Sequence, residues 1–514
     1  MSERLFRILG LIADDLIEEA GRSASRRRPW RNLAAAACVV LVCGATFGFL
    51  AASGGNLLSG GASGNTASDG ASAGAGEHDG GTAFMSYAGP ILPLTTAEAN
   101  PGLLSERTIT WDLSPGTYAD GSPRQWGAAV SDCYALTNPS EETITVTALY
   151  PFTGSFSALP SIQPEVTVNG AAAEPKLYAG PYAGGFRDAG EADDSTWNLA
   201  RPSSWTDYQE LLESGAYLDQ ALGEEPRLDV PVTVYSFSDF SLPEDAPDAA
   251  TQAVTFTLDP ERTTVLSYGF NGMSQEAGWR QYSYFVPNGV RSESDLKLLV
   301  IIGDDLGAYT LQGYVDGGCE QMLADVSCTV TRTETTFDAV LEEICRSYAA
   351  EYNARRSTEE ATAFDFLSLD MLQRAAAELL TQYGLFSENA KDRYSDGRLD
   401  EIVSESLVQE RVLYLAFPVT IPAGGSAAVS VALWKEPSYD FGCSGSENTD
   451  LQGYDLITCL GSTLNFTSQT AVLAETQGVE LVRQNIGFDP EDGITQVPLD
   501  LTEEHYFIEI RPTP

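Results

Sequence analysis

Apolar and polar residues alternate in short segments along most of the chain beyond residue 130. The clearest segment is 143–150 (TITVTALY), in which every second residue from Ile144 to Tyr150 is apolar. A period of two predicts a β-strand with one buried face. The turn sequence Asn138-Pro139-Ser140-Glu141 separates this strand from another predicted at 131–137. We expect the two strands to form an antiparallel hairpin.

The same pattern predicts many further strands. The segment 166–168 is followed by Asn169-Gly170, the favoured pair for a two-residue hairpin turn. Short alternating strands with polar turns are typical of antiparallel β-sandwiches. We therefore expect a mainly β fold with two or three sandwich domains, because the chain is too long for one core. The remaining predicted strands are 231–237, 253–258, 264–268, 297–302, 325–331, 412–419, 427–434, 479–483 and 506–510.

Three segments have helical spacing instead. Residues 337–353 and 369–383 carry apolar side chains at every third or fourth position, and together they predict a helical hairpin packed against the sheets. Ser368 is the expected N-cap of the second helix, and Gly384 is the residue at which this helix is expected to end. A further helix is predicted at 205–215.

An uninterrupted apolar run lies near the start of the chain. Residues 33–52 contain no charged residue, and a helix of this length crosses the hydrocarbon core of a bilayer. A cluster of arginines precedes the run at 22–31, and the next basic residue is Arg107, which predicts a cytoplasmic N-terminus. A cleaved signal peptide is the alternative, because Ala51-Ala52-Ser53 resembles a cleavage site. The long charged segment before the run and the length of the run favour an uncleaved transmembrane helix.

The cytoplasmic segment is expected to contain an amphipathic helix at residues 3–20. Ser2 is its predicted N-cap and Gly21 follows its last turn. Acidic residues in its second half would be repelled by an anionic membrane surface. We therefore expect a cytosolic protein partner, not lipid, at this helix. Its apolar stripe consists of Leu5, Leu9, Ile12, Leu16 and Ala20.

The start of the chain resembles the N-terminus of a group of Gram-positive single-pass membrane proteins. The resemblance rests on the run Asp14-Asp15-Leu16-Ile17-Glu18-Glu19-Ala20, the arginine cluster after it and the single span. Some members of this group are anti-sigma-factor-like, and many are uncharacterised. The resemblance covers roughly residues 1–50 of the 514. It implies a contact between the helix at 3–20 and a cytosolic protein such as a transcription factor.

Charge divides the chain at the predicted membrane. Residues 1–32 carry seven arginines and five acidic residues, whereas the remaining residues carry 22 basic and 68 acidic ones. A surface this acidic repels phosphate backbones and anionic head groups, so we expect no nucleic-acid partner. Solubility outside the cell explains the charge, and cation binding, calcium included, is the alternative.

Composition completes the predicted organisation of the chain. Residues 53–82 are rich in Gly, Ser and Ala and predict a flexible linker. The other predicted segments are 1–32 (cytoplasmic helix and basic cluster), 33–52 (transmembrane helix), 83–190 (β-sandwich domain), 191–333 (helical connector and second β-rich domain), 334–410 (helical hairpin) and 411–514 (C-terminal β-rich segment).

Six cysteines lie outside the predicted span, an even number that suggests disulfides in an oxidising compartment. Cys443 and Cys459 flank a polar loop, and we expect these two to be bonded. Cys345 lies on an apolar helix stripe and Cys328 lies in an alternating strand, so buried free thiols are the alternative for both.

Histidine is scarce, which limits the possible chemistry. His78 lies in the linker and His505 lies in the last strand, where it alternates with Phe507 and Glu509 opposite an apolar face. We expect His505 to face solvent. A multi-histidine metal site is excluded, and Ser-His-Asp or Cys-His catalysis would depend on His505 alone. No catalytic, cofactor-binding or metal-binding residue and no cofactor is assigned.

Three further motifs resemble known sites but lack residues that those sites require or predict a turn. Ser294 and Lys297 have the SxxK spacing of serine acyl-transferases, but the companion KTG sequence is missing. The segment 392–397 begins like a calcium loop, but Tyr394 and Val403 occupy the third and twelfth ligand positions. Residues 489–493 predict a turn and not a cation site.

Two functions fit these features. The first is a single-pass, membrane-anchored protein with most of its chain extracellular, which binds or senses an external ligand without catalysis and signals through the helix at 3–20 in an anti-sigma-like way. The alternative is a cell-surface carbohydrate-binding module or a glycan-active enzyme, which as an enzyme would need two carboxylates about 5–10 Å apart across a pocket. Aromatic residues that would stack on sugars in the alternative are Tyr178, Tyr182, Phe186, Trp197, Trp205 and Tyr208.

Overall fold

The computed structural model describes residues 89–98, 102–117, 121–124, 126–182, 213, 215–223, 228–244, 249–286, 296–355, 361–440 and 449–513. The helix predicted at 3–20, the span at 33–52, the linker at 53–82 with His78, and nearly all of the helix at 205–215 lie outside these residues. Within the described ranges, no helix is long and apolar enough to cross a membrane.

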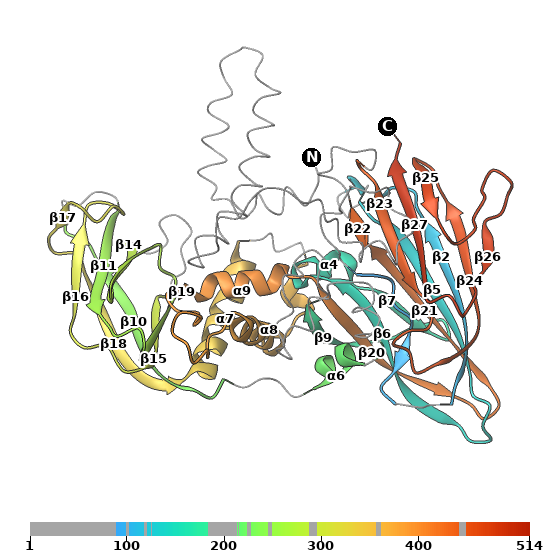
Figure 1. Ribbon diagram of the computed structural model, residues 1–514, viewed down its shortest axis with the longest axis horizontal. Coiled ribbons are helices and arrows are strands. Elements are labelled where there is room, and N and C mark those ends of the chain that lie inside the picture. The colour runs from blue at the N-terminus through green and yellow to red at the C-terminus, as the bar shows by residue number, and fades with distance from the viewer. Residues whose placement is uncertain are drawn as a thin grey trace, which may run out of the picture. The chain divides into compact units, whose positions relative to one another are not determined.

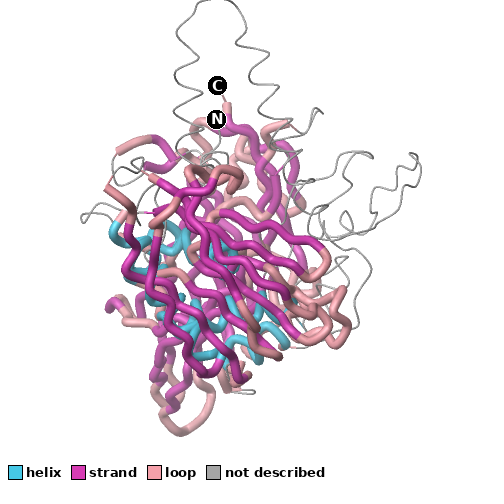
Figure 2. Tube along the Cα trace, turned by 90° about the vertical axis from the view of Figure 1, so that its left-hand side faces the viewer, coloured by secondary structure: helices cyan, strands magenta, loops and turns pink. Residues whose placement is uncertain are grey.

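The prediction of a mainly β fold is confirmed. Strands dominate the described chain (Figure 2) and form several sheets whose pairings are mostly antiparallel. Two pairings are parallel: β2 (Leu104–Asp112) pairs with β24 (Asn465–Glu475), and β12 (Thr263–Tyr268) pairs with β19 (Gly397–Arg398). A small two-stranded pair is made by β3 (Gly116–Thr117) and β4 (Pro123–Arg124).

Two sheets take strands from both ends of the described chain, and a third consists of its last strands alone. The seven-stranded sheet has the order β26-β24-β2-β5-β21-β7-β8, the β20 sheet has the order β1-β6-β20-β9, and the β27 sheet has the order β22-β23-β27-β25. Strands of the predicted segments 83–190 and 411–514 therefore occur together in the first two of these sheets. The bounds are β1 Thr95–Thr96, β5 Ala128–Thr137, β6 Ile144–Gly154, β7 Glu165–Val168, β8 Ala171–Ala172, β9 Lys176–Tyr182, β20 Arg411–Ile421, β21 Ser426–Lys435, β22 Tyr439–Asp440, β23 Gln452–Ile457, β25 Val479–Gln484, β26 Gln496–Pro498 and β27 His505–Pro512.

The hairpin predicted between β5 and β6 is wrong, although both strands form. β5 pairs with β2 and β21, whereas β6 pairs with β1 and β20 in a different sheet. The Asn138 side chain holds the crossing, because its Nδ2 donates to the Glu142 carbonyl (2.7 Å) and to the Pro422 carbonyl (3.2 Å). A local turn sequence reverses the chain, but it does not determine which strand becomes the neighbour.

The hairpin predicted at Asn169-Gly170 is confirmed. Val168 of β7 pairs with Ala171 of β8. Asn169 and Gly170 both have positive φ, at 52° and 78°, as a two-residue turn of this type requires. The turn residues alone determine this pairing, because the two strands are adjacent in sequence.

The middle of the chain forms two further sheets. The β10 sheet has the order β18-β10-β15-β12-β19, and the β11 sheet has the order β13-β14-β11-β16-β17. The two sheets share an apolar cluster rich in aromatic rings, in which Phe256 stacks on Tyr282 with centroids 5.9 Å apart. The bounds are β10 Pro231–Ser241, β11 Ala250–Thr257, β13 Gly272–Glu276, β14 Trp279–Val286, β15 Leu298–Gly303, β16 Tyr309–Tyr314, β17 Met322–Leu323 and β18 Ser327–Thr336.

Both helices of the predicted hairpin form, as α7 (Phe337–Ala354) and α8 (Leu369–Gln382). Ser368 is the N-cap of α8, since its hydroxyl accepts a hydrogen bond from the Met371 amide (3.2 Å), and Gly384 has a φ of 78° where the chain leaves the helix. Cys345 is fully buried on α7 with a free thiol, as the alternative for this residue proposed.

A third helix, α9 (Leu399–Val408), was not predicted. Figure 1 shows α7, α8 and α9 packed against one another, and α9 also contacts β12. One apolar cluster runs from the β10 sheet through these helices to the β20 and seven-stranded sheets. The short remaining helices are η1 (Phe156–Ala158), α4 (Leu159–Ile162), α6 (Ala216–Leu222) and η4 (Ala363–Asp365).

A buried ion pair lies where the seven-stranded, β20 and β27 sheets meet. Arg107 of β2 and Asp132 of β5 form two parallel hydrogen bonds, Nε to Oδ1 and Nη2 to Oδ2, both 2.8 Å, and their side chains are 1% and 0% exposed. Arg107 Nη1 also donates to the Ile457 carbonyl at the end of β23 (2.8 Å). Tyr134 and Tyr150 donate their hydroxyls to Asp132 Oδ2, at 2.7 and 3.3 Å.

The environment of this pair shifts the pKa values of its neighbours. Burial is the largest single influence and lowers the pKa of the Arg107 guanidinium, but the charge and hydrogen bonds of Asp132, together with Tyr134 and Tyr150, outweigh it, so the pKa is raised overall. Burial, followed by the carboxylate of Asp132, raises the pKa of Tyr150 well above its usual value. Arg107 therefore keeps its charge, and the raised pKa values of Tyr134 and Tyr150 keep their hydroxyls protonated as donors to Asp132.

A second buried pair connects the helices to the β20 sheet. Arg411, at the start of β20, lies with its Nη1 3.3 Å from Glu378 Oε2 on α8, and Arg374 of α8 lies 3.1 Å from the other carboxylate oxygen. The Arg411 guanidinium also covers the Phe156 ring at 5.1 Å. Burial lowers the pKa of Arg411, and Glu378 opposes this shift.

Asp132→Asn should destabilise the protein strongly, because it leaves the Arg107 charge buried without a counter-charge. We expect a loss of about 3–5 kcal/mol in the free energy of unfolding, measured by urea titration of the purified chain. The double variant Arg107→Met with Asp132→Asn removes both charges and should recover part of this loss. Equal stability of wild type and Asp132→Asn would contradict a structural role for the pair.

Candidate functional site

Titratable side chains gather on one face of the β27 sheet, opposite the face that carries Tyr506, Ile508 and Ile510. His505 Nε2 lies 2.8 Å from Asp455 Oδ1, and the two side chains are 6% and 3% exposed. The prediction that His505 faces solvent is wrong. β27 lies between β23 and β25, and both of its faces are covered from 505 to 510. The imidazole also stacks on Phe507, with centroids 6.4 Å apart.

Glu509, two residues further along β27, is fully buried on the same face. Its carboxylate accepts the Tyr439 hydroxyl (2.9 Å) and forms an ion pair with Arg483 of β25. Gly453 on β23 makes room for the Tyr439 ring, because a Cβ at this position would lie 2.2 Å from ring atoms. The side chains of three strands are thus joined by charged and polar contacts.

Lys435, at the end of β21, is a buried cation close to this face. Its ammonium donates to Thr153 Oγ1 (3.2 Å) and to the Glu436 carbonyl (2.8 Å). Burial lowers the pKa of Lys435 to about 8, against the opposing charges of Glu436, Glu410 and Asp455. The sequence does not predict that Lys435 is buried. Adjacent residues of a strand point to opposite faces, and the apolar Trp434 suggests that its own face is the buried one.

Ser438, which contacts Asp455, is bound to the backbone. Ser438 Oγ accepts a hydrogen bond from the Asp455 amide (3.0 Å), and Ser438 is fully buried. A Ser-His-Asp triad requires an imidazole between the hydroxyl and the carboxylate, with the hydroxyl open to substrate. This face therefore forms a polar network that joins strands, and its buried imidazole does not reach a surface where a substrate would bind.

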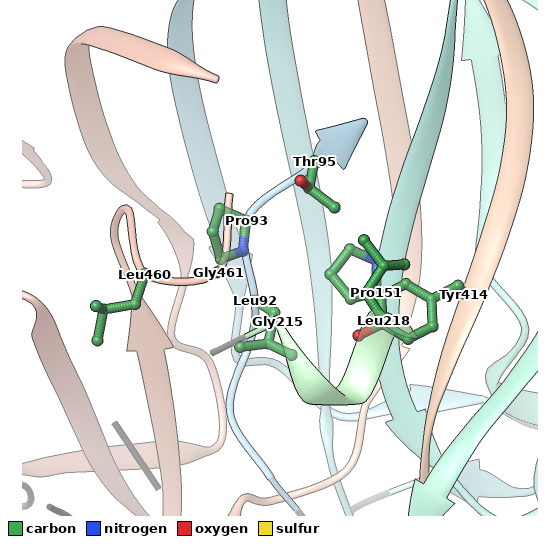
Figure 3. A pocket seen from close by; sticks show the side chains of 9 residues that line it. All are labelled: Leu92, Pro93, Thr95, Pro151, Gly215, Leu218, Tyr414, Leu460 and Gly461. Atoms are coloured by element: carbon green, nitrogen blue, oxygen red, sulfur yellow. The ribbon is translucent and has the colours of Figure 1, made fainter. Parts of the chain in front are cut away.

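A small cavity lies beside α6, where loops of the β20 and β27 sheets come together (Figure 3). The side chains of Leu92, Pro151, Leu218 and Tyr414 face it. Its volume, about 30 Å³, holds about one or two water molecules. The full lining is Leu92, Pro93, Thr95, Pro151, Gly215, Leu218, Tyr414, Leu460 and Gly461. It contains no carboxylate and is too small for a sugar ring.

The acidic and lysine motifs are occupied by contacts within the protein. Asp396 accepts hydrogen bonds from Arg280 Nε (2.7 Å) and the Tyr282 hydroxyl (2.8 Å). Lys297 is buried and donates to the Gly269 carbonyl (3.1 Å), whereas Ser294 lies outside the described residues. The turn predicted at 489–493 is confirmed, since Asp489 Oδ1 accepts the Asp492 amide (3.1 Å).

The disulfide expected between Cys443 and Cys459 is not formed in this structure. Cys459 is a free thiol whose sulfur lies 3.6 Å from Gln469 Nε2, and Cys443 lies outside the described residues. Cys328 is also free and accepts the Tyr284 hydroxyl at 3.3 Å.

The aromatic stretch that the alternative function uses is described only at Tyr178. This residue is half-buried, and the Lys176 ammonium lies 4.5 Å from its ring centroid. The side chains of Tyr182, Phe186, Trp197, Trp205 and Tyr208 lie outside the described part of the chain. Among the residues that are described, no group of three or more His, Cys, Asp or Glu is placed to hold a metal ion.

Comparison with family models, with curated proteins and with solved structures finds no match to this chain.

Lys435→Met should change the pH dependence of stability. Between the folded pKa of about 8 and the unfolded value of 10.5, the unfolded state binds the additional proton. The free energy of unfolding of the wild type should therefore rise with pH in this window, by up to about 1.4 kcal/mol per pH unit. Urea titrations from pH 7 to 10 should show a flatter profile for the variant.

The matched control is Lys391→Met, because Lys391 is exposed. This control should keep the slope of the wild type. The same slope in wild type and Lys435→Met would show that Lys435 does not titrate in that window.

Proposed function

We propose that this chain is a single-pass membrane-anchored protein whose β-rich part lies outside the cytoplasm and binds or senses an external ligand. The order of segments at the start of the sequence carries the proposal: an amphipathic helix at 3–20, arginines at 22–31, an apolar run at 33–52 and a Gly/Ser/Ala-rich linker at 53–82. A basic cluster on one side of a span of this length fixes the N-terminus in the cytoplasm.

The acidic character of the remaining chain supports the same orientation. A part with 68 acidic and 22 basic residues is repelled by anionic head groups and stays in solution beyond the linker. A flexible linker of about thirty residues averages roughly 30 Å from end to end, which carries the β-rich part clear of the membrane surface.

We propose that the β-rich part consists of two antiparallel sandwiches. The seven-stranded sheet faces the β20 and β27 sheets, and the β10 sheet faces the β11 sheet. The support is that each facing pair contributes side chains to common apolar clusters. Sandwiches of this kind present loops and sheet faces to solvent as binding surfaces.

Binding, as opposed to catalysis, accounts for the chemistry of the described residues. The imidazole of His505 is buried against Asp455, and the cavity beside α6 has an uncharged lining. A glycan-active enzyme would use two carboxylates across a pocket, and this cavity supplies neither.

The helix at 3–20 is proposed as the cytosolic contact through which the protein signals. Its apolar stripe would dock on a protein partner, and its acidic residues would keep it off the inner leaflet. The resemblance of residues 14–20 and the following span to anti-sigma-factor-like membrane proteins points to a transcription factor as the class of partner.

Protease added to wall-stripped cells should degrade residues 83–514 and spare a tag fused at residue 1. The reason is that the span separates the two parts, with the arginine cluster on the cytoplasmic side. Immunoblots with tags at both ends measure the result. Cleavage of the N-terminal tag from outside would contradict the proposed orientation. Release of the whole chain from the membrane at neutral pH would contradict the proposed transmembrane anchor.

Ile12→Asp should abolish capture of the cytosolic partner without changing membrane insertion. A docked stripe would lose apolar burial worth about 1.5–3 kcal/mol and would have to desolvate a new charge. Cross-linking followed by pull-down from the host cell measures capture, and membrane fractionation measures insertion.

The control variant is Asp14→Lys with Asp15→Lys, which keeps the stripe and reverses the acidic patch. Protein docking predicts weaker capture for this variant too. If both variants retain every cytosolic contact and the lysine variant binds anionic vesicles no better than wild type, the helix is only an extension of the anchor.

A further inference from the structure

The outer strands of the five larger sheets differ greatly in length. Six of the ten, β1, β8, β17, β19, β22 and β26, have two or three residues. β9 contains Pro181, and the register of β25 shifts between Leu481 and Arg483. Short edges, prolines and irregular register are the means by which proteins prevent strand addition. Most edges of this protein are therefore blunted.

Two outer strands lack these features, and they are the five-residue β13 (Gly272–Glu276), which begins with a glycine, and β18. β18 is the longer of the two. It has ten residues, Ser327–Thr336, without Gly or Pro (SCTVTRTETT). It pairs with β10 in one continuous register from Thr329 to Thr336, and a register shift separates only its first residues, at Ser238–Ser241 of β10. Among the described residues no strand pairs with its other edge. Residues 331–334 are exposed on both faces of the strand. Five threonines and a valine give this edge a strong preference for extended structure.

We propose that β18 of one copy of the chain pairs antiparallel with β18 of a second copy, around a two-fold axis at Thr333. The inference goes beyond the proposed function and does not depend on it. A two-fold axis makes the same surface serve both copies. Each copy then supplies the missing neighbour of the other, so the two β10 sheets become one continuous sheet.

The charges on the strand select this register. Directly opposed residues lie on the same face of a sheet, so a two-fold axis at Thr333 places Arg332 opposite Glu334 of the partner subunit, and Glu334 opposite Arg332 of the partner subunit. An axis at Arg332 would oppose two arginines, and an axis at Glu334 would oppose two glutamates. Opposite charges on facing strands stabilise the pairing, and like charges destabilise it.

Both charged side chains have the freedom to make these contacts. Arg332 is 43% exposed and Glu334 is 73% exposed. Arg332 lies 2.8 Å from the carboxylates of both Glu334 and Asp305 in this structure. Its guanidinium therefore already lies among carboxylate acceptors at the edge of β18. The planar guanidinium carries several donors and serves more than one carboxylate at a time. The threonines of the other face would form a matching row, with Thr331 opposite Thr335 of the partner subunit.

Cysteine substitution at the axis tests the register directly. In the proposed dimer Thr333 faces its own copy across the axis, within the Cα separation of about 4.4–6.8 Å that a disulfide needs. Thr333→Cys in the full chain should give a disulfide-linked dimer on mild oxidation. Thr331→Cys is the matched control on the same face, because its copies would lie roughly 14 Å apart along the strands. Wild type, run in parallel, reports cross-linking by the native cysteines.

Charge reversal tests the selection. Glu334→Arg places an arginine opposite Arg332 of the partner subunit at both ends of the axis, so like charges replace opposite charges. The substitution should weaken dimerisation about tenfold. Sedimentation of the detergent-solubilised full chain measures this effect. Adding Arg332→Glu exchanges the two charges and should restore the dimer. The thermal melting of each variant shows whether the fold is retained.

Three results would overturn the proposal. The first is a monomeric wild type together with no more cross-linking of Thr333→Cys than of Thr331→Cys. The second is a dimer that Glu334→Arg leaves unchanged. The third is stronger association after Glu334→Arg, which would mean that these charges keep the edge apart.

Discussion

The buried pair of Arg107 and Asp132 imposes a constraint on the whole interleaved half of the molecule. Neither charge is stable in an apolar interior without the other, so β2 and β5 must lie side by side in one register. The free donors of the guanidinium then reach the Ile457 carbonyl and Gln469, and the carboxylate collects the hydroxyls of Tyr134 and Tyr150. These contacts tie the seven-stranded sheet to β6 of the β20 sheet and to the end of β23 in the β27 sheet.

The other buried charges follow the same rule in other parts of the fold. Glu378 holds Arg411 where the helices meet the β20 sheet, and Asp455 and Glu509 hold His505 and Arg483 on the β27 sheet. Each pair joins elements that are far apart in sequence. Several of the described basic residues of this acidic chain are thus buried, where they fix the neighbours of strands and helices.

This distribution bears on function. Histidine, lysine and arginine side chains that would otherwise be candidates for chemistry are occupied as structural contacts, which is consistent with a binding or sensing role for the proposed external part. The same distribution leaves β18 as an unusual surface, since Arg332 and Glu334 are a cation and an anion exposed together on an unblunted edge.

Local sequence determined the elements whose cause is local. Alternation identified β6, β10 and β20, Asn169-Gly170 set the β7–β8 turn, and Ser368 and Gly384 marked the ends of α8. Strands β2, β14 and β24 were not predicted. Each of them carries polar residues on its covered face as well as on its open face, so apolar and polar residues do not alternate regularly along it. α9 was missed although Leu399, Ile402 and Val403 have helical spacing, because the segment is short and follows a loop.

Tertiary structure alone decided which strands are neighbours and which faces are buried. β5 and β6 are adjacent in sequence but belong to different sheets, since their partners β20 and β21 arrive almost three hundred residues later. His505 alternates as an exposed residue would, yet its imidazole is buried against Asp455 of β23 and Phe507. An alternation of apolar and polar residues indicates that a strand has two unlike faces. What covers the second face depends on contacts between distant residues, and no local pattern contains them.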